Sequence, residues 1–103
     1  MIRHVVLLKF RDDIDRPTRD ALFRDLEGLR AHLPGVLGFH ASANISVETD
    51  LIRGNHDGFW VDFADEAARD AYLVDARHKD VGARIVAHTV GGIDGVTVFD
   101  FDL

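Results

Sequence analysis

The segment that follows Met1, IRHVVLLKF, predicts a β-strand over residues 2–10 that is apolar on both of its faces. Side chains along a strand point alternately to its two sides. One side of this strand carries Val5 and Leu7. The other side carries one polar and three apolar residues: His4, Val6, Leu8 and Phe10. A strand of this kind needs cover on both sides, which restricts the folds that the chain can adopt.

A chain of 103 residues can cover one face of a sheet with its own helices. The second face then needs another cover, and we expect an identical subunit to provide it. His4 is the one polar group on this second face. A histidine inside an apolar layer is a first indication of a functional site, although hydrogen-bonded histidines also occur in ordinary protein cores.

Two helical regions are predicted from capping residues and from apolar side chains at helical spacing. The first begins at Asp15, a suitable N-cap, and ends at Pro34-Gly35. The second begins at Asp65, breaks near residues 78–80, continues for one or two turns and stops at Gly91-Gly92. Both regions are long enough to cover one face of a small sheet.

Three further strands are predicted, over residues 36–46, 58–64 and 96–101. In the last of them Val96 and Val98 share one face, and Phe99 and Phe101 share the other, so it repeats the two-sided pattern of the first strand. The order β-α-β-β-α-β is that of the ferredoxin-like α+β fold, in which an antiparallel sheet carries both helices on one face. We expect one such domain over residues 1–103.

Composition restricts the partners of the chain. The formal net charge of -6 argues against nucleic acid, whose binding depends on basic surfaces. The sequence has no apolar run of membrane-spanning length, and its N-terminus leads straight into a strand, so no membrane association is expected. The absence of cysteine fits a reducing cytoplasm. The histidines lack the compact spacing of metal ligands, so no zinc site is expected, and a loosely bound cation near Asp57 or Glu48 stays open.

Five segments, taken in order, resemble the stress-responsive A/B barrel (Dabb) family over nearly the whole chain: RHVVLLKF, the pair Leu33-Pro34, RGNHDGFWVDF, AYLVDARH and VTVFDFDL. The resemblance implies a ferredoxin-like subunit that pairs its sheet with a second copy to form a dimeric α/β barrel. Most members of the family have no established activity. The best-known enzyme among them is olivetolic acid cyclase, a plant polyketide cyclase that performs an aldol condensation without a metal or an organic cofactor.

The resemblance to this cyclase also implies a set of candidate catalytic residues. His4, Tyr72 and His78 stand at the positions of its cavity histidine, its helix tyrosine and the histidine that follows six residues later. A further histidine of the cyclase is replaced here by Asp57, and His56 lies one residue away from that position. This departure separates the chain from the cyclase at one of four positions.

The chemistry of these residue types suits proton transfer. A neutral imidazole is a reasonable general base near neutral pH, and a tyrosine hydroxyl can hydrogen-bond the carbonyl or enolate oxygen of a substrate. We expect the cavity of His4, Tyr72 and His78 to lie between the helices and the sheet of one subunit, or at an end of the barrel. Asp57 is predicted near the cavity mouth, where it would orient one histidine. The candidates for substrate contact are His56, Asp57 and Trp60.

Structural interpretations of the same residues remain open at this point. Tyr72 can be a packing tyrosine with a hydrated hydroxyl, and His78 can stabilise the C-terminal end of its helix. Room for a ligand beside the Tyr72 ring would come from the small side chains of Ala68 and Ala71. Residues 75–78 read DARH, without the proline that family members often have there, so this end of the helix is less constrained.

The sequence therefore predicts a cytoplasmic homodimer that binds a small, largely apolar carbonyl compound. It would act without a cofactor, as a cyclase, an isomerase or a related lyase. One alternative is a non-catalytic stress-responsive protein whose dimer matters for its own sake. A further alternative is a cofactor-free monooxygenase, because related dimeric barrels include such enzymes. The sequence leaves open whether the protein is an enzyme, and it does not identify a substrate.

Overall fold

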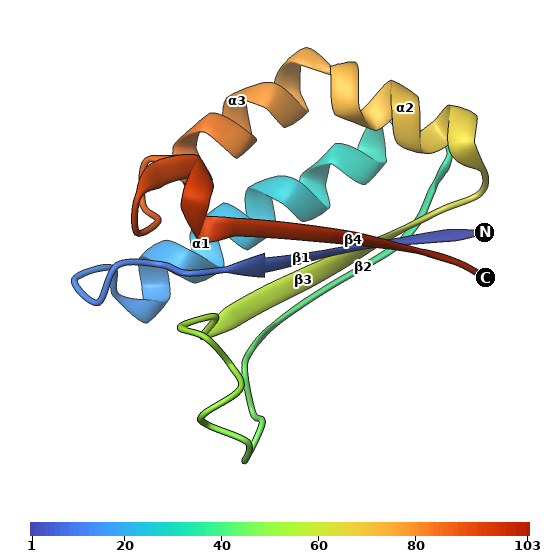
Figure 1. Cartoon of the computed structure of the whole chain (residues 1–103). Coiled ribbons are helices and arrows are strands. Elements are labelled where there is room, and N and C mark those ends of the chain that lie inside the picture. Colours follow the sequence, from blue (N-terminus) through green and yellow to red (C-terminus); the bar gives the residue numbers. More distant parts are fainter.

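A computed structural model describes residues 1–103, which form one four-stranded antiparallel sheet with helices on one face. In chain order the elements are β1 (Ile2–Leu8), α1 (Arg16–Glu27), the 3-10 helix η1 (Gly28–Ala31), β2 (Val36–Ala43), β3 (Asp57–Phe63), α2 (Glu66–Val74), α3 (Ala76–Val86), the 3-10 helix η2 (Gly92–Gly95) and β4 (Val96–Asp102). The strand order is β2-β3-β1-β4, and Figure 1 shows the three α-helices on the same side of the sheet. The predicted ferredoxin-like α+β fold is confirmed. None of the helices has the length and apolar character needed to cross a lipid bilayer.

The first helical region begins where the sequence predicts. Asp15 caps α1, because its Oδ1 accepts a hydrogen bond from the backbone N–H of Thr18 at 2.9 Å. Leu22 and Leu26 then bury one side of the helix against the sheet. The α-helix ends at Glu27 and continues as η1, so the predicted helical region consists of an α-helix followed by a tighter turn.

The second helical region differs from the prediction in the position of its break. Asp65 caps α2 as predicted, by accepting a hydrogen bond from the N–H of Ala68 at 2.9 Å. The helix ends just before Asp75, whose extended backbone (φ -62°, ψ 132°) ends α2 and starts α3. His78 therefore lies in the first turn of α3, not at the predicted break. The interpretation of His78 as a stabiliser of a helix C-terminus is wrong, because it lies near an N-terminus.

The helices cover one face of β1 and leave the other face open. Four residues of the strand are buried beneath the helices: Ile2, His4, Val6 and Leu8. The alternate residues, among them Val5 and Leu7, lie on the face that no helix covers. The sequence analysis assigned the face with His4 to a partner subunit, and the structure corrects this, since the chain's own helices cover His4. The open face is the one that carries Val5 and Leu7.

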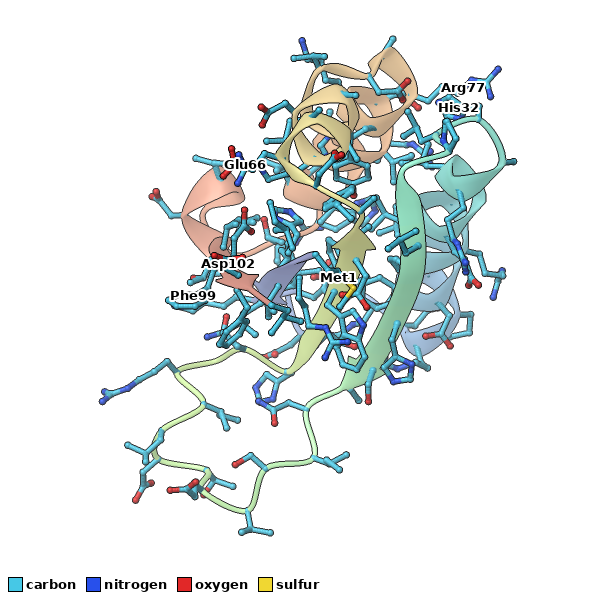
Figure 2. All side chains as sticks on the ribbon, turned by 90° about the vertical axis from the view of Figure 1, so that its right-hand side faces the viewer. Met1, His32, Glu66, Arg77, Phe99 and Asp102 are labelled. Carbon is cyan, nitrogen blue, oxygen red and sulfur yellow. The ribbon has the colours of Figure 1, made fainter.

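The open face of the sheet is largely apolar and exposed. In the register between β1 and β4, Phe99 lies opposite Val5, which places Phe99 on this face. Phe99 is 61% exposed and Phe101 is 48% exposed, and Figure 2 shows Phe99 on the side of β4 away from the helices. Leu7 is also exposed, at 39%. A monomer therefore leaves several large hydrophobic side chains of its sheet in water.

A close approach between β2 and α2 removes the space expected beside Ala68. Gly35, which precedes β2, contacts Ala68 so closely that a side chain on Gly35 would collide with the Ala68 Cβ. Ala68 also packs against the hydrophobic core. The prediction that this alanine leaves room for a ligand is therefore wrong. Its small side chain serves the contact between helix and strand.

Candidate functional site

A cavity of about 260 Å³ lies between the helices and the covered face of the sheet. Its only polar side chains are those of His4, from β1, and His78, from α3. The apolar wall includes residues from α1, α3 and β4: Leu26, Ile85, Val86, Val96 and Val98. An apolar cavity with a few convergent polar groups is typical of a small-molecule site, and its modest size suits a small ligand.

His4 is held by a carboxylate of the neighbouring strand. Its side chain is 7% exposed, and its Nδ1 lies 2.7 Å from Oδ1 of Asp100, which stands directly opposite in β4. A second oxygen of Asp100 lies 3.4 Å from Nη1 of Arg69. An ionised carboxylate can only accept hydrogen bonds, so the proton of neutral His4 belongs on Nδ1. The Nε2 lone pair of His4 is then left to accept a proton.

Tyr72 is buried, and its hydroxyl makes no hydrogen bond within the chain. The residue is 1% exposed, and its Oη has no hydrogen-bond partner within the chain. Burial raises the pKa of Tyr72 far above the ordinary value for a phenol, so the hydroxyl stays protonated at neutral pH. The Tyr72 ring is not part of the cavity wall, but its centroid lies 6.1 Å from that of His4 and 4.0 Å from that of His78.

His78 is half-buried and carries a second unpartnered polar atom. Its Nδ1 is buried and makes no hydrogen bond of good geometry, although the Leu73 carbonyl lies close enough to the ring to affect its pKa. Burial, and to a smaller degree the charge that His4 would carry, lower the pKa of His78 below its usual value, while the Leu73 carbonyl acts in the opposite direction. At neutral pH the imidazole is therefore neutral and able to accept a proton.

The structure thus brings His4, Tyr72 and His78 together at one place, as the sequence analysis expects. They supply one hydroxyl donor and two imidazoles with acceptor capacity, at the edge of an apolar cavity. Such a set can remove a proton from a carbon acid and hydrogen-bond the oxygen on which negative charge develops.

Asp57 does not belong to this group. Its side chain is fully buried, and its oxygens lie 2.6 Å from Nη1 of Arg16 and 2.7 Å from Nη1 of Arg19. It is not part of the cavity wall, and the carboxylate that orients a histidine is Asp100. The hypothesis that Asp57 orients a histidine at the cavity mouth is wrong, because two arginines of α1 occupy both of its oxygens.

His56 and Trp60, the other two predicted substrate contacts, also lie outside the cavity. His56 is exposed in the connection between β2 and β3, where its carbonyl accepts a hydrogen bond from the N–H of Asn44 at 2.7 Å. Trp60 lies on the open face of the sheet, with the guanidinium of Arg3 at 4.6 Å from its ring centroid and the His40 ring at 4.8 Å. The structure therefore does not bring them together with His4.

Sequence reasoning missed Asp100, although a signal for it was present. Asp100 shares a face of the last strand with Val96 and Val98, so it is an acidic residue in an otherwise apolar layer. In a ferredoxin-like sheet the first and last strands are neighbours, which makes a partner for His4 in the last strand a reasonable expectation. The exact pairing depends on the register, which the sequence alone does not give.

No group of three or more His, Cys, Asp or Glu side chains is arranged so that it could hold a metal ion. The polar groups beside the cavity are two histidines, a tyrosine hydroxyl and the carboxylate that binds His4.

The chain belongs to the stress-responsive A/B barrel domain (Dabb) family, whose sequence model matches residues 2–103. A dimeric ferredoxin-like protein of unknown function from Jannaschia sp. CCS1 is 30% identical to it in sequence. Its structure superposes with a TM-score of 0.90 over 99% of this chain and 98% of that one. No curated protein matches the sequence significantly.

Two structurally similar proteins are enzymes. A hydroxynitrile lyase from Passiflora edulis is 11% identical, with a TM-score of 0.82 over 99% of this chain and 92% of that one. A mutant of SnoaB, a cofactor-independent oxygenase from Streptomyces nogalater, is 12% identical, with a TM-score of 0.76 over 99% of this chain and 91% of that one. At this level of identity the likeness shows a shared fold alone.

Proposed function

We propose that the protein is a homodimer in which each subunit binds a small, largely apolar carbonyl compound in its covered cavity. There it transfers a proton next to the carbonyl group without a cofactor, as a cyclase, an isomerase or a lyase does. The observation that carries this proposal is an apolar cavity lined by His4 and His78, together with two buried, unpartnered polar atoms, Tyr72 Oη and His78 Nδ1, on rings whose centroids lie 4.0 Å apart. The Tyr72 ring centroid also lies 6.1 Å from that of His4, whose Nδ1 is bound by Asp100.

The buried Tyr72 hydroxyl, which makes no hydrogen bond within the chain, favours a ligand that carries an oxygen. A buried donor without a partner costs about 1–3 kcal/mol, and a carbonyl oxygen placed beside the Tyr72 hydroxyl would remove that cost. The apolar wall around the rest of the cavity favours a compound whose remaining surface is hydrocarbon. A ligand in the cavity meets His4 and His78 directly, and the proposal requires that its oxygen also reach the Tyr72 hydroxyl beside the His78 ring.

The proton step follows from these positions. The neutral imidazole of His78 accepts a proton from the carbon next to the carbonyl group, and the electron pair of that C–H bond becomes the C=C bond of an enolate. The charge then resides on the former carbonyl oxygen, which accepts a hydrogen bond from the Tyr72 hydroxyl. His4 supplies a second imidazole, whose Nδ1 is bound by Asp100. Return of the proton, or attack of the enolate on a second carbonyl group, completes the reaction.

The test is enzyme-catalysed exchange of the methyl protons of acetophenone in D2O, followed by 1H NMR. Wild-type protein should accelerate the exchange, and Tyr72→Phe and His78→Ala should each remove most of the acceleration while the protein stays folded. His56→Ala is the matched control, because His56 is an exposed histidine outside the cavity, and it should behave as wild type. If His78→Ala exchanges as fast as wild type, or if wild type gives no acceleration, the proposed catalysis is wrong.

The dimer is proposed from the open face of the sheet. At about 25 cal/mol per Å² of apolar area, leaving large side chains such as Phe99 and Leu7 in water forgoes several kcal/mol of burial. The similar protein from Jannaschia sp. CCS1 is dimeric.

Light scattering at micromolar concentration should give twice the mass of the chain, and Val5→Asp on the open face should give monomers. Val74→Asp, a change at a 70% exposed residue of α2, should leave the dimer intact. A folded wild-type monomer under these conditions would contradict the proposal.

A further inference from the structure

Asp75 binds two parts of the molecule at once. Its Oδ2 accepts a hydrogen bond from the backbone N–H of His78 at 2.9 Å, which caps α3. Its Oδ1 lies 2.9 Å from Nε2 of His32, which follows η1. The side chains of Asp75 and His32 are 16% and 28% exposed. The Asp75 carboxylate therefore connects His32, the residue after η1, to the backbone of His78, the candidate base.

We propose that Asp75 and His32 are positioning residues, which set the ring of His78 against Tyr72 at the cavity. The catalytic role of His78 rests on the function proposed above, whereas its position can be tested without any ligand. The α2–α3 junction fixes this position, because α2 ends and α3 begins at the single residue Asp75. His78 is the residue whose N–H that carboxylate holds, so a shift of Asp75 shifts the backbone of His78 directly.

The hydrogen bonds of this group form a directed chain. The N–H of His78 and the side chain of His32 hold the pKa of Asp75 below its usual value, so the carboxylate is ionised and acts only as an acceptor. His32 must then donate from Nε2, which leaves its Nδ1 as an acceptor. Nη1 of Arg77 lies 3.4 Å from that Nδ1, and Figure 2 shows Arg77 next to His32. The tautomer and orientation of His32 are thus set from both sides.

A comparison with the other helix caps shows what is special here. Asp15 and Asp65 cap α1 and α2 with the same geometry, each by a 2.9 Å hydrogen bond from the N–H three residues later. Neither of them has a histidine on its other oxygen, and neither caps a residue of the cavity. Asp75 alone combines a cap, a histidine partner and a candidate base. Its position therefore matters for the site as well as for the helix.

The test is the set of NMR nuclear Overhauser contacts between the ring protons of His78 and Tyr72 in the ligand-free protein, whose centroids lie 4.0 Å apart. Asp75→Ala should abolish these contacts and His32→Ala should weaken them, because the first change removes the cap and the second removes its anchor. His32→Gln should restore them, since a glutamine amide can donate in place of Nε2. Asp65→Ala, which removes an equivalent cap, should leave them unchanged.

If the contacts persist in both Asp75→Ala and His32→Ala, the positioning role is wrong. If they are also lost in Asp65→Ala, the effect is general loosening of the helices, and the proposal fails equally. Should Asp75→Ala not fold, the pair His32→Ala and His32→Gln decides, because His32 is partly exposed and outside the hydrophobic core. None of these outcomes depends on acetophenone exchange, so the proposed function and this inference can fail separately.

Discussion

Two clusters of polar side chains, built around Asp57 and around His4 on the covered face of the sheet, differ in how completely their hydrogen bonds are made. In the first, Arg16 and Arg19 occupy both oxygens of Asp57 at 2.6 and 2.7 Å. Arg19 also donates to the backbone carbonyls of Ile14, at 2.8 Å, and Arg11, at 3.1 Å. No side-chain atom of this cluster is buried without a partner.

The second cluster, around His4, is incomplete. Asp100 satisfies one nitrogen of His4, but Tyr72 Oη and His78 Nδ1 have no partner in the chain. The only other buried side-chain atom without a partner is Oδ1 of Asn55. Since buried polar groups in proteins are nearly always paired, a concentration of unpaired atoms beside a cavity indicates a site, and a completed network indicates a structural role. The comparison thus contrasts a completed hydrogen-bond network with an incomplete one, and the incomplete one is the site of the proposed function.

The largest expected effect concerns the complete cluster. Asp57→Ala leaves the guanidinium of Arg19, whose side chain is 13% exposed, without its carboxylate partner. Breaking a buried ion pair in this way costs about 3–5 kcal/mol, so we expect a loss of that order in the free energy of unfolding. Urea denaturation at fixed protein concentration measures it. A loss below about 1 kcal/mol in the free energy of unfolding would show that the Asp57 cluster contributes little to stability, and its contrast with the His4 cluster would then fail.

A smaller effect is expected from the carboxylate of the incomplete cluster. Asp100→Asn keeps the shape of the side chain but no longer enforces the tautomer of His4, so acetophenone exchange should fall by about tenfold or more. The free energy of unfolding should change much less than in Asp57→Ala, because the Asp100 side chain is 29% exposed. Exchange rates and urea curves of the two variants are compared. An Asp100→Asn variant that is strongly destabilised and exchanges at the wild-type rate would reverse the assignment of the two clusters.

The smallest effect is a pH dependence of stability at His78. The pKa of His78 is lowered in the folded state, so below about pH 6.5 the unfolded chain binds a proton that the folded protein resists. Stability from this residue is present above that pH and is lost as the pH falls toward the folded-state pKa. His78→Gln should lose less stability between pH 7.5 and 5.5 than wild type, by less than about 1.4 kcal/mol per pH unit. Identical pH profiles of the two proteins would show that His78 is not desolvated.

Much of the fold could be predicted from the sequence, because its signals are local. Strand-length segments, apolar on both faces in the first and last of them, predicted four strands, and the caps Asp15 and Asp65 marked two helix starts that the structure confirms. The break at Asp75 was placed near His78 because the cap signal of Asp75 was not recognised. Which face of the first strand the helices cover depends on packing, and the sequence analysis assigned it wrongly for His4.

The candidate site could be predicted only in part, because its contacts join residues far apart in the sequence. Resemblance to a family indicated His4, Tyr72 and His78, which the structure places side by side. The same resemblance drew Asp57 into the site, since nothing local shows that arginines 41 and 38 residues away bind it. Asp100, 96 residues from His4, depends on strand register and was missed for the same reason.

The proposed function requires that the cavity beside His4, Tyr72 and His78 recognises a carbonyl oxygen. The most direct measurement compares the dissociation constants of acetophenone and α-methylstyrene, its isostere with CH2 in place of the oxygen, for wild type and Tyr72→Phe. Wild type should bind acetophenone about tenfold more tightly, the size of one hydrogen bond to a buried donor, and Tyr72→Phe should bind both compounds equally. Equal binding of the two compounds by wild type, or a preference that survives in Tyr72→Phe, would contradict the claim.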